Sequence, residues 1–255
     1  MKEDTAIVKS VLKALAALDF VLEKSMVSRG AGLGEIAAGL DLQPTNTRNI
    51  LKTMEQAGYI GRTADRLYIP GPKCEAMNRT ILVGRQLIPE IMPVLDALVA
   101  EFGESFVVTT LFGGRRKVLM WRKGTSPIVV ETQNAERNCK TYQLVTTRIM
   151  LAFAPAHEQE NFIAFNGLPP ASDWTEADTP AKLKHCLENL RKTGYAEYYP
   201  GKGEIYAAAF PIIDNEDKSV GALGIYLPAF RMTPDLRSRI FESILLKLSH
   251  LRKQL

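Results

Sequence analysis

The sequence predicts an α+β protein of two domains joined by a helix. Residues 33–69 contain two short helix patterns followed by a basic hairpin, whereas residues 87–255 contain strand hairpins mixed with amphipathic helices. Pro70, Gly71 and Pro72 end the first block, because this combination breaks regular structure. We therefore expect a first domain at 1–72, a linker helix at 73–86 and a second domain with an antiparallel sheet at 87–255.

The first predicted helix runs from about Thr5 to Lys24. Its apolar residues cover more of the helix surface than the core of one small domain needs: Val8, Val11, Leu12, Leu15, Leu18, Phe20 and Leu22. We expect one side of this helix to pack on its own domain and the other to pack on a second copy of the chain.

A helix, a tight turn and a second helix follow. The first of these two helices has apolar residues at helical spacing, namely Leu33, Ile36, Ala37 and Leu40. The second begins at Pro44, because proline at the first helical position loses no needed N–H and already has a helical φ. Gly58 is placed to end it. Two short β-prone runs then surround a tip that carries Arg62 and Arg66, which predicts a hairpin.

This order of elements is that of a winged helix-turn-helix, in which the second helix lies in the major groove of DNA. The side of that helix away from the apolar residues carries groups able to contact phosphates and base edges: Gln43, Thr45, Asn46, Arg48, Asn49 and Lys52. Arg62 and Arg66 are expected to reach DNA from the wing. A polar helix face alone is equally compatible with simple exposure to solvent, so the prediction depends on the whole arrangement.

The second domain begins with an amphipathic helix, IPEIMPVLDALVAEFG, and two strands around Gly113-Gly114. PIVVET is expected to form a third strand. YQLVTTRIMLAFAP, HEQENFIAF and TPAKLKHCLENLRKTG are expected to form helices, and IYAAAFPII and SVGALGIYL two more strands. A helix entered at Thr233-Pro234 closes the chain.

Composition excludes several classes of protein. The net charge of +4 is small, so nonspecific attraction to DNA would be weak and binding would depend on the placement of a few cations. No apolar run is long enough to span a membrane, and the N-terminus lacks the apolar core of a signal peptide, so we expect a cytoplasmic protein. The three cysteines lack metal-ligand spacing. No nucleophile motif, phosphate loop or histidine pair indicates catalysis, so we expect no enzyme, metal or cofactor.

The chain resembles the IclR family of bacterial transcriptional regulators over nearly its whole length. The resemblance rests on LGEIAAGLDLQPTNTRNILKTMEQAGYI and LYIPG in the first domain, and on RKTGYAEYY, AAAFPI and ALGIYLPAFRMTP in the second. It departs in the second helix of the helix-turn-helix, where the family usually has Ser-Thr and then Arg, and this chain has Thr45-Asn46 and Asn49. The resemblance implies a GAF-like effector domain at 87–255.

The resemblance also implies a pocket for a small acid or aromatic compound in that domain. Carried over by position, its residues are Tyr142, Thr146, Arg148, Tyr198, Ala207, Gly224 and Tyr226. Family members that bind small carboxylates tend to have an acid, a cysteine and two serines at the positions occupied here by Tyr198, Ala207, Gly224 and Tyr226. The tyrosines here either line a site for an aromatic carboxylate, with Arg148 as its charge partner, or fill the cavity.

We therefore expect a DNA-binding transcriptional regulator of this type, a homodimer or a dimer of dimers, that binds double-stranded operator DNA under control of a small-molecule effector. The alternative is a ligand-independent DNA-binding repressor or architectural protein with a filled effector pocket.

Overall fold

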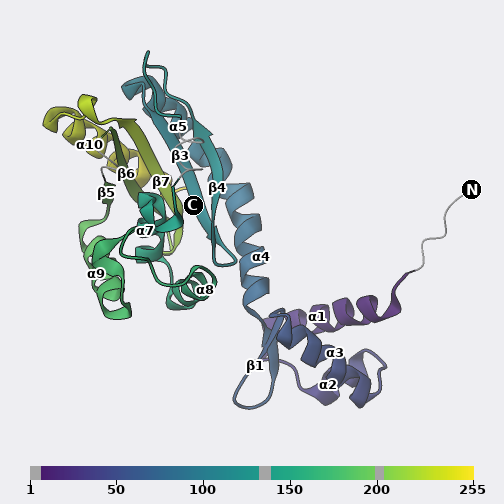
Figure 1. Cartoon of the computed structure of the whole chain (residues 1–255). Coiled ribbons are helices and arrows are strands. Elements are labelled where there is room, and N and C mark those ends of the chain that lie inside the picture. The colour runs from purple at the N-terminus through teal and green to yellow at the C-terminus, as the bar shows by residue number, and fades with distance from the viewer. Residues whose placement is uncertain (1–6, 132–138, 199–203) are drawn as a thin grey trace, which may run out of the picture. The chain divides into compact units, whose positions relative to one another are not determined.

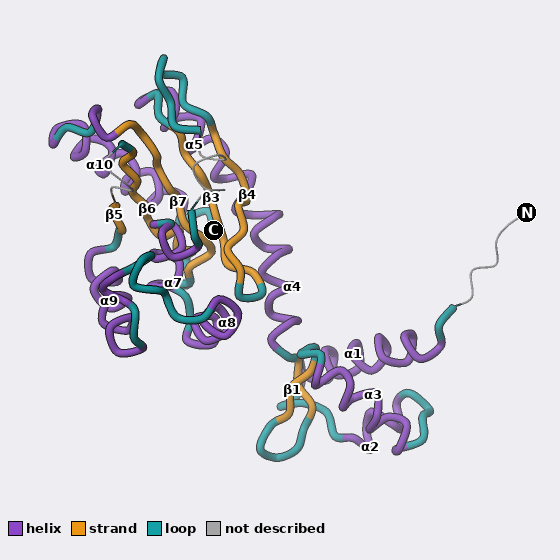
Figure 2. The backbone as a smooth tube through the Cα atoms, viewed as in Figure 1, coloured by secondary structure: helices purple, strands orange, loops and turns teal. Residues whose placement is uncertain are grey.

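The computed structural model describes residues 7–131, 139–198 and 204–255. It contains two compact units, Met1–Thr80 and Ile81–Leu255, each with its own buried core. Figure 1 shows the elements of both units, and Figure 2 separates helices from strands. The boundary between the units lies inside one helix, α4 (Pro72–Leu82).

The first unit has the order helix, helix, helix, hairpin. Its elements are α1 (Lys9–Val27), α2 (Leu33–Gly39), α3 (Pro44–Gln56), β1 (Ile60–Arg62) and β2 (Tyr68–Pro70). Pro44 begins α3 as predicted, and Gly58 follows its end with φ +79°, a backbone angle that favours glycine. β1 and β2 pair antiparallel. The predicted winged helix-turn-helix is confirmed.

A small apolar core holds this unit together. Ala17 and Val21 of α1 pack with Ile36 of α2, Leu51 of α3 and Tyr68 of β2, all of them buried. Glu35 accepts hydrogen bonds from the backbone N–H of Gly32 and pairs with Lys24 at 3.0 Å, and these contacts lower the pKa of its carboxyl group. α1 and α2 are thereby joined at the start of the helix-turn-helix.

The second unit is built on a five-stranded antiparallel sheet in the order β4-β3-β7-β6-β5. The strands are β3 (Ser105–Phe112), β4 (Arg115–Arg122), β5 (Ala196–Tyr198), β6 (Ile205–Ile213) and β7 (Ser219–Pro228). Side chains alternate between the two sides of each strand. On β6, Ala207 and Ala209 belong to one core, and Tyr206, Ala208 and Phe210 to the other.

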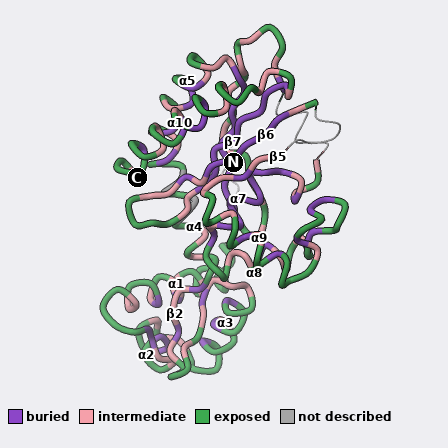
Figure 3. The backbone as a smooth tube through the Cα atoms, turned by 90° about the vertical axis from the view of Figure 1, so that its left-hand side faces the viewer, coloured by how far each residue is buried: buried purple, intermediate pink, exposed green. Residues whose placement is uncertain are grey.

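Helices cover both sides of this sheet, so the central strands are buried along most of their length, as Figure 3 shows. One side packs on α5 (Ile88–Phe102) and α10 (Pro234–Leu251). The other side, which we call the α7 face, packs on α7 (Val145–Phe153) and α9 (Pro180–Thr193), with α8 (Ala156–Asn166) beside β4. Short helical turns are η1 (Val83–Leu87), η2 (Thr141–Gln143), η3 (Thr175–Ala177) and η4 (Ala229–Arg231).

The predicted α+β class is confirmed, but three details differ from the sequence prediction. The segment PIVVET forms no strand over its described residues 127–131, and Thr132 lies outside the described residues. The carbonyl of Val130 instead accepts a hydrogen bond from the hydroxyl of Ser105. Pro127 has no N–H with which to pair to a neighbouring strand. The first helix begins at Lys9 and continues to Val27, while Thr5 and Ala6 lie outside the described residues. The short edge strand β5 was not predicted.

No helix within 7–131, 139–198 and 204–255 is both long and apolar enough to cross a membrane.

The α10 helix offers a matched test of this packing. Ile240 is fully buried in the core of the sheet, whereas Leu246 on the same helix is mostly exposed. Ile240→Ala should lower the free energy of unfolding of the second unit by about 2–5 kcal/mol, because it leaves a cavity in a packed core. Leu246→Ala should change it by less than about 0.5 kcal/mol. Urea unfolding of the two variants measures the difference, and equal effects would contradict the assignment of α10 to this core.

Candidate functional sites

The outer side of α3 is an exposed polar surface. Thr47, Leu51 and Met54 point into the core and Ile50 packs partly against it, whereas most other positions of α3 face solvent. The residues predicted to contact DNA are all exposed: Gln43, Thr45, Asn46, Arg48, Asn49 and Lys52. Within the described part of the chain, Arg48 and Lys52 form no ion pair. Their charges are therefore available to an external anion.

The wing brings two more cations to the surface. Arg62 lies over the ring of Tyr68, with its guanidinium carbon 5.2 Å from the ring centre, and its Nε donates to the carbonyl of Arg66 at 3.5 Å. Arg66 has a φ of +63°, and its backbone N–H donates to the carbonyl of Thr63. Arg62 thus partly stabilises the hairpin, whereas Arg66 presents its side chain at the exposed tip.

One side of α1 exposes a line of apolar residues. Val8, Val11, Leu12 and Leu15 are each more than half exposed, and Leu22 continues the line. Spacings of three, four and seven residues put them on neighbouring positions of one helix surface. A contiguous apolar strip of this kind on a helix usually marks an interface.

In the second unit, the residues assigned to the effector pocket come together on the α7 face. Tyr198 of β5 pairs in register with Ala207 of β6, and Ala207 pairs with Tyr226 of β7. Thr146 and Arg148 reach the same area from α7, and Tyr142 from the turn before it. All but Tyr198, which is half-buried, are buried.

Gly224 explains one departure from the family pattern. A methyl group at this position would lie 2.7 Å from Cγ2 of Thr146 and 2.9 Å from Cγ1 of Val107. These distances are shorter than van der Waals contact, so the close approach of α7 to the sheet requires a residue without a side chain. A serine at this position would not fit this arrangement.

Arg148 is the one charged residue in this group. Its Nε donates to the carbonyl of Tyr142 at 2.7 Å and its terminal nitrogen to the carbonyl of Asp173 at 2.8 Å. The guanidinium lies between two rings, 4.7 Å from the centre of Trp174 and 5.0 Å from that of Tyr198. Burial lowers its pKa, and within the described residues no carboxylate forms an ion pair with it.

Two other polar groups on this face also form hydrogen bonds within the protein. The hydroxyl of Tyr142 donates to the carbonyl of Gly167, and burial raises the pKa of this tyrosine to about 12. The hydroxyl of Thr146 accepts from Nε of Arg116 at 2.9 Å. The protein's own groups therefore occupy hydrogen-bonding positions of Tyr142, Thr146 and Arg148.

The sequence analysis did not identify Asp173 and Trp174 as site residues. Both are buried, in a loop that carries no pattern of regular structure. Asp173 pairs with Lys140 at 3.2 Å and accepts from Gln143, and this fixes the loop against the start of α7. A tryptophan beside a buried arginine could have been suspected only once both were placed in space. Within the described residues no group of His, Cys, Asp and Glu side chains could hold a metal ion.

Both units match known protein families. Residues 10–64 match the IclR helix-turn-helix domain, and residues 79–249 match the family described as bacterial transcriptional regulator IclR C-terminal. Proteins of this kind are DNA-binding transcriptional regulators with a C-terminal effector-binding domain, and they are not enzymes.

Solved structures of similar proteins share the fold. An IclR-type regulator from Silicibacter sp. is 20% identical, with a TM-score of 0.56 over 96% of this chain and 95% of the other. IclR of Thermotoga maritima is 22% identical, with a TM-score of 0.54 over 97% and 98%. The repressor BlcR of Agobacterium tumefaciens is 18% identical, with a TM-score of 0.50 over 97% of each chain. The two family matches cover most of the sequence, and the chain belongs to the IclR family of bacterial transcriptional regulators.

Proposed function

We propose that this regulator binds operator DNA as a dimer through α3 and the wing, and that an aromatic carboxylate bound at the α7 face alters its affinity. The proposal combines an exposed cationic surface in the first unit with a buried arginine in the second, Arg148, that forms no ion pair within the described residues. A regulator that binds operator DNA would act in the bacterial cytoplasm. The segment 73–86 would connect the DNA-binding domain at 1–72 to the effector domain at 87–255.

The DNA contacts divide into two kinds. Thr45, Asn46 and Asn49 carry short polar groups suited to base edges, with Gln43 at the start of the helix. Arg48 can contact either guanine or phosphate, whereas the other exposed cations, Lys52, Arg62 and Arg66, suit phosphates. The small net charge of the chain implies that these local contacts carry most of the affinity.

Arg48→Ala should weaken operator binding. If Arg48 reads a base, the variant should lose roughly 1–3 kcal/mol of binding free energy on the operator only. If Arg48 contacts a phosphate, the affinities for operator and random DNA should fall alike, and the slope of the salt dependence should decrease by about one. Gel shifts on both DNAs at several salt concentrations distinguish the two.

Lys13→Ala is the control, because Lys13 is an exposed cation on α1, outside α3 and the wing. Unchanged affinity of Arg48→Ala, or an equal loss in the control, would remove α3 from the interface.

Dimerisation is proposed through α1 and α4. Besides the exposed strip on α1, Met77 of α4 in the same unit is more than half exposed. A dimer that buries these apolar residues of α1 and α4 would carry two recognition helices and contact two half-sites. Its affinity for DNA would exceed that of a single copy for one half-site. A dimer of dimers would need a further contact in the second unit.

Leu12→Glu combined with Leu15→Glu should convert the dimer to monomers, because burying two carboxylates in an apolar seam is costly. Sedimentation velocity measures the change. Phe230→Glu is the matched control, since Phe230 is an exposed apolar residue of the second unit. A double variant that remains dimeric would place the main interface elsewhere.

The effector proposal depends on Arg148. A guanidinium buried without a direct ion pair is costly, and two backbone carbonyls, two ring faces and the nearby charges of Glu176 and Asp173 offset only part of that cost. A ligand carboxylate would add a direct ion pair in a bidentate geometry that arginine favours. Trp174 and Tyr198 beside it would contact an aromatic ring.

Benzoate and 2-naphthoate should raise the melting temperature of the wild type, with benzamide as the uncharged comparison. Ligand at 100 times its Kd stabilises by about 2.7 kcal/mol. Arg148→Met should abolish the response. Arg239→Met, which removes an exposed arginine from α10, should retain it. A response that survives Arg148→Met would contradict the assigned charge partner.

The second candidate function is ligand-independent regulation, favoured by the burial of Tyr142, Thr146 and Tyr226 and by the internal hydrogen bonds of this face. In that case no carboxylate shifts the melting temperature of the wild type. Tyr226→Ser should then lower stability by about 3–5 kcal/mol, because it empties a packed aromatic position.

A further inference from the structure

The edge strand β5 has few backbone contacts to hold it on the sheet. It pairs with β6 only at Ala196, Glu197 and Tyr198, and among the described residues no strand pairs with its other side. A strand this short with one neighbour has little stability of its own. Its side chains must therefore keep it in place, and those of Glu197 and Tyr198 do so in different directions.

Glu197 fastens β5 to the first turns of α10. Its carboxylate accepts two hydrogen bonds from Arg237, one from Nε at 2.8 Å and one from a terminal nitrogen at 2.7 Å, each to a different oxygen. The hydroxyl of Tyr206 on β6 donates to the same carboxylate. Burial acts to raise the pKa of Glu197, but the hydrogen bonds from Arg237 and Tyr206 lower it below its usual value. The carboxylate is thus charged at neutral pH, and its two parallel bonds to arginine are among the strong kinds of hydrogen bond.

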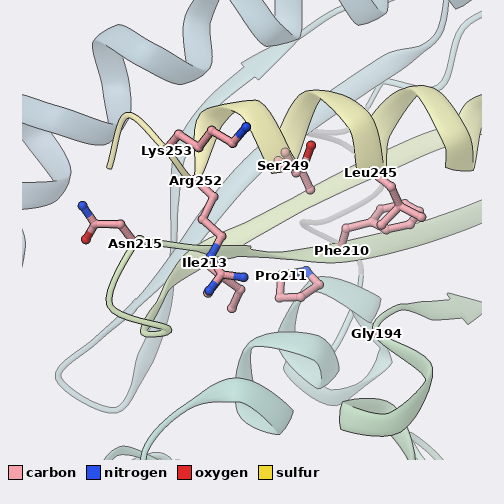
Figure 4. A pocket seen from close by; sticks show the side chains of 10 residues that line it. Gly194, Phe210, Pro211, Ile213, Asn215, Leu245, Ser249, Arg252 and Lys253 are labelled. Carbon is pink, nitrogen blue, oxygen red and sulfur yellow. The ribbon is translucent and has the colours of Figure 1, made fainter.

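Aromatic rings fix the position of Arg237. Its guanidinium carbon lies 4.1 Å from the ring centre of Phe241 and 5.5 Å from that of Tyr195, whose hydroxyl accepts a further hydrogen bond at 3.2 Å. Phe241 packs edge-on against Tyr195 and Phe210, with ring centres 4.9 and 4.8 Å apart. In Figure 4, α10 lies across β6 and the ring of Phe210 points toward the helix. Arg237 is therefore held where it meets Glu197, which spares the pair most of the entropy of ordering.

Glu197 and Tyr198 act on opposite sides of the sheet, because neighbouring residues of a strand point to opposite faces. Ala208, opposite Glu197, belongs to the core under α10, and Ala207, opposite Tyr198, belongs to the core of the α7 face. On that face the ring of Tyr198 lies 5.0 Å from the guanidinium carbon of Arg148. β5 cannot carry this ring away from Arg148 without disturbing the contacts of Glu197 on the other side.

We propose that the ion pair between Glu197 and Arg237 is a latch that keeps β5, and with it the ring of Tyr198, closed over Arg148. Both are positioning residues, since they act on the α7 face only through β5. The role of the latch in regulation rests on the proposed binding of a carboxylate at Arg148, which would require β5 to move. The apparent affinity for such a ligand is reduced by the fraction of molecules in which the latch is closed. Opening it would also free the start of α10, so a ligand on one side of the sheet would change contacts on the other.

The test is amide hydrogen exchange of the full-length protein, measured by mass spectrometry on peptides from each strand. Glu197→Gln keeps the shape of the side chain and removes its charge, so it should speed exchange in β5 about tenfold and leave β3 and β7 unchanged. Arg237→Lys keeps the charge without the two parallel bonds and should give a smaller increase. Glu101→Gln is the matched control, because Glu101 of α5 also accepts hydrogen bonds from α10, at Ser243 and Lys247, and it should leave β5 unchanged.

Calorimetric titration with benzoate tests the link to the α7 face. Glu197→Gln should bind benzoate about tenfold more tightly than the wild type or Glu101→Gln, because less of the binding free energy is used to open the latch.

Two results of the exchange experiment would overturn the latch. Unchanged exchange in β5 would show that Glu197 does not hold the strand, and equal acceleration in β3, β5 and β7 would show a general loss of stability. Benzoate binding that is equal or weaker in Glu197→Gln than in the wild type would also overturn it. Faster exchange confined to β5, with no benzoate binding to any variant, would support the latch and contradict the proposed effector class instead.

Discussion

The burial of one positive charge organises the α7 face of the second unit. Arg148 projects from α7 and contacts three other segments: the carbonyl of Tyr142 before the helix, the loop with Asp173 and Trp174, and Tyr198 of β5. A charge in this position must be surrounded by dipoles and ring faces, because desolvation disfavours it. The contacts with Arg148 hold these segments together. The same segments are proposed to bind the effector.

This arrangement suggests how a ligand could act on the regulator. A bound carboxylate would compete with the carbonyls of Tyr142 and Asp173 for the same guanidinium, so the loop before η3 and the edge strand β5 would have to move. The ligand would then control DNA binding if the rearranged conformation and the conformation described above differ in their affinity for the operator. In the proposed dimer, the affinity for DNA would depend on a few cations and on the pairing of two copies, so a change in the spacing of the copies would weaken binding to one half-site.

Local patterns predicted much of the fold because they reflect local physics. Pro44 at the start of α3 and Gly58 beyond its end act through their own backbone preferences, and the nearly continuous apolar runs of β6 and β7 reflect burial on two sides of a sheet. The prediction of a strand at PIVVET was wrong because a β-prone run forms a strand only beside a partner strand. The carbonyl of Val130 instead accepts a hydrogen bond from the side chain of Ser105. β5 is only three residues long and has no pattern of its own.

The candidate site was predictable only in part. The resemblance placed Arg148, Tyr198 and Tyr226 in one area, and the structure brings them together. The role of Trp174 depends on a loop whose path is set by contacts between residues distant in sequence, such as Asp173 with Lys140. The need for Gly224 follows from the distance between α7 and the sheet, which no sequence pattern encodes.

Arg148 is enclosed together with the rings of Trp174 and Tyr198. The chain has two tryptophans, so Trp121→Phe leaves Trp174 as the sole indole fluorophore. Trp121 is 41% exposed and Trp174 only 6%, so the substitution removes the accessible one. Acrylamide quenching of the Trp121→Phe protein is the most direct measurement. The enclosed arrangement predicts blue-shifted emission and weak quenching, whereas quenching near that of a solvent-exposed indole would contradict it.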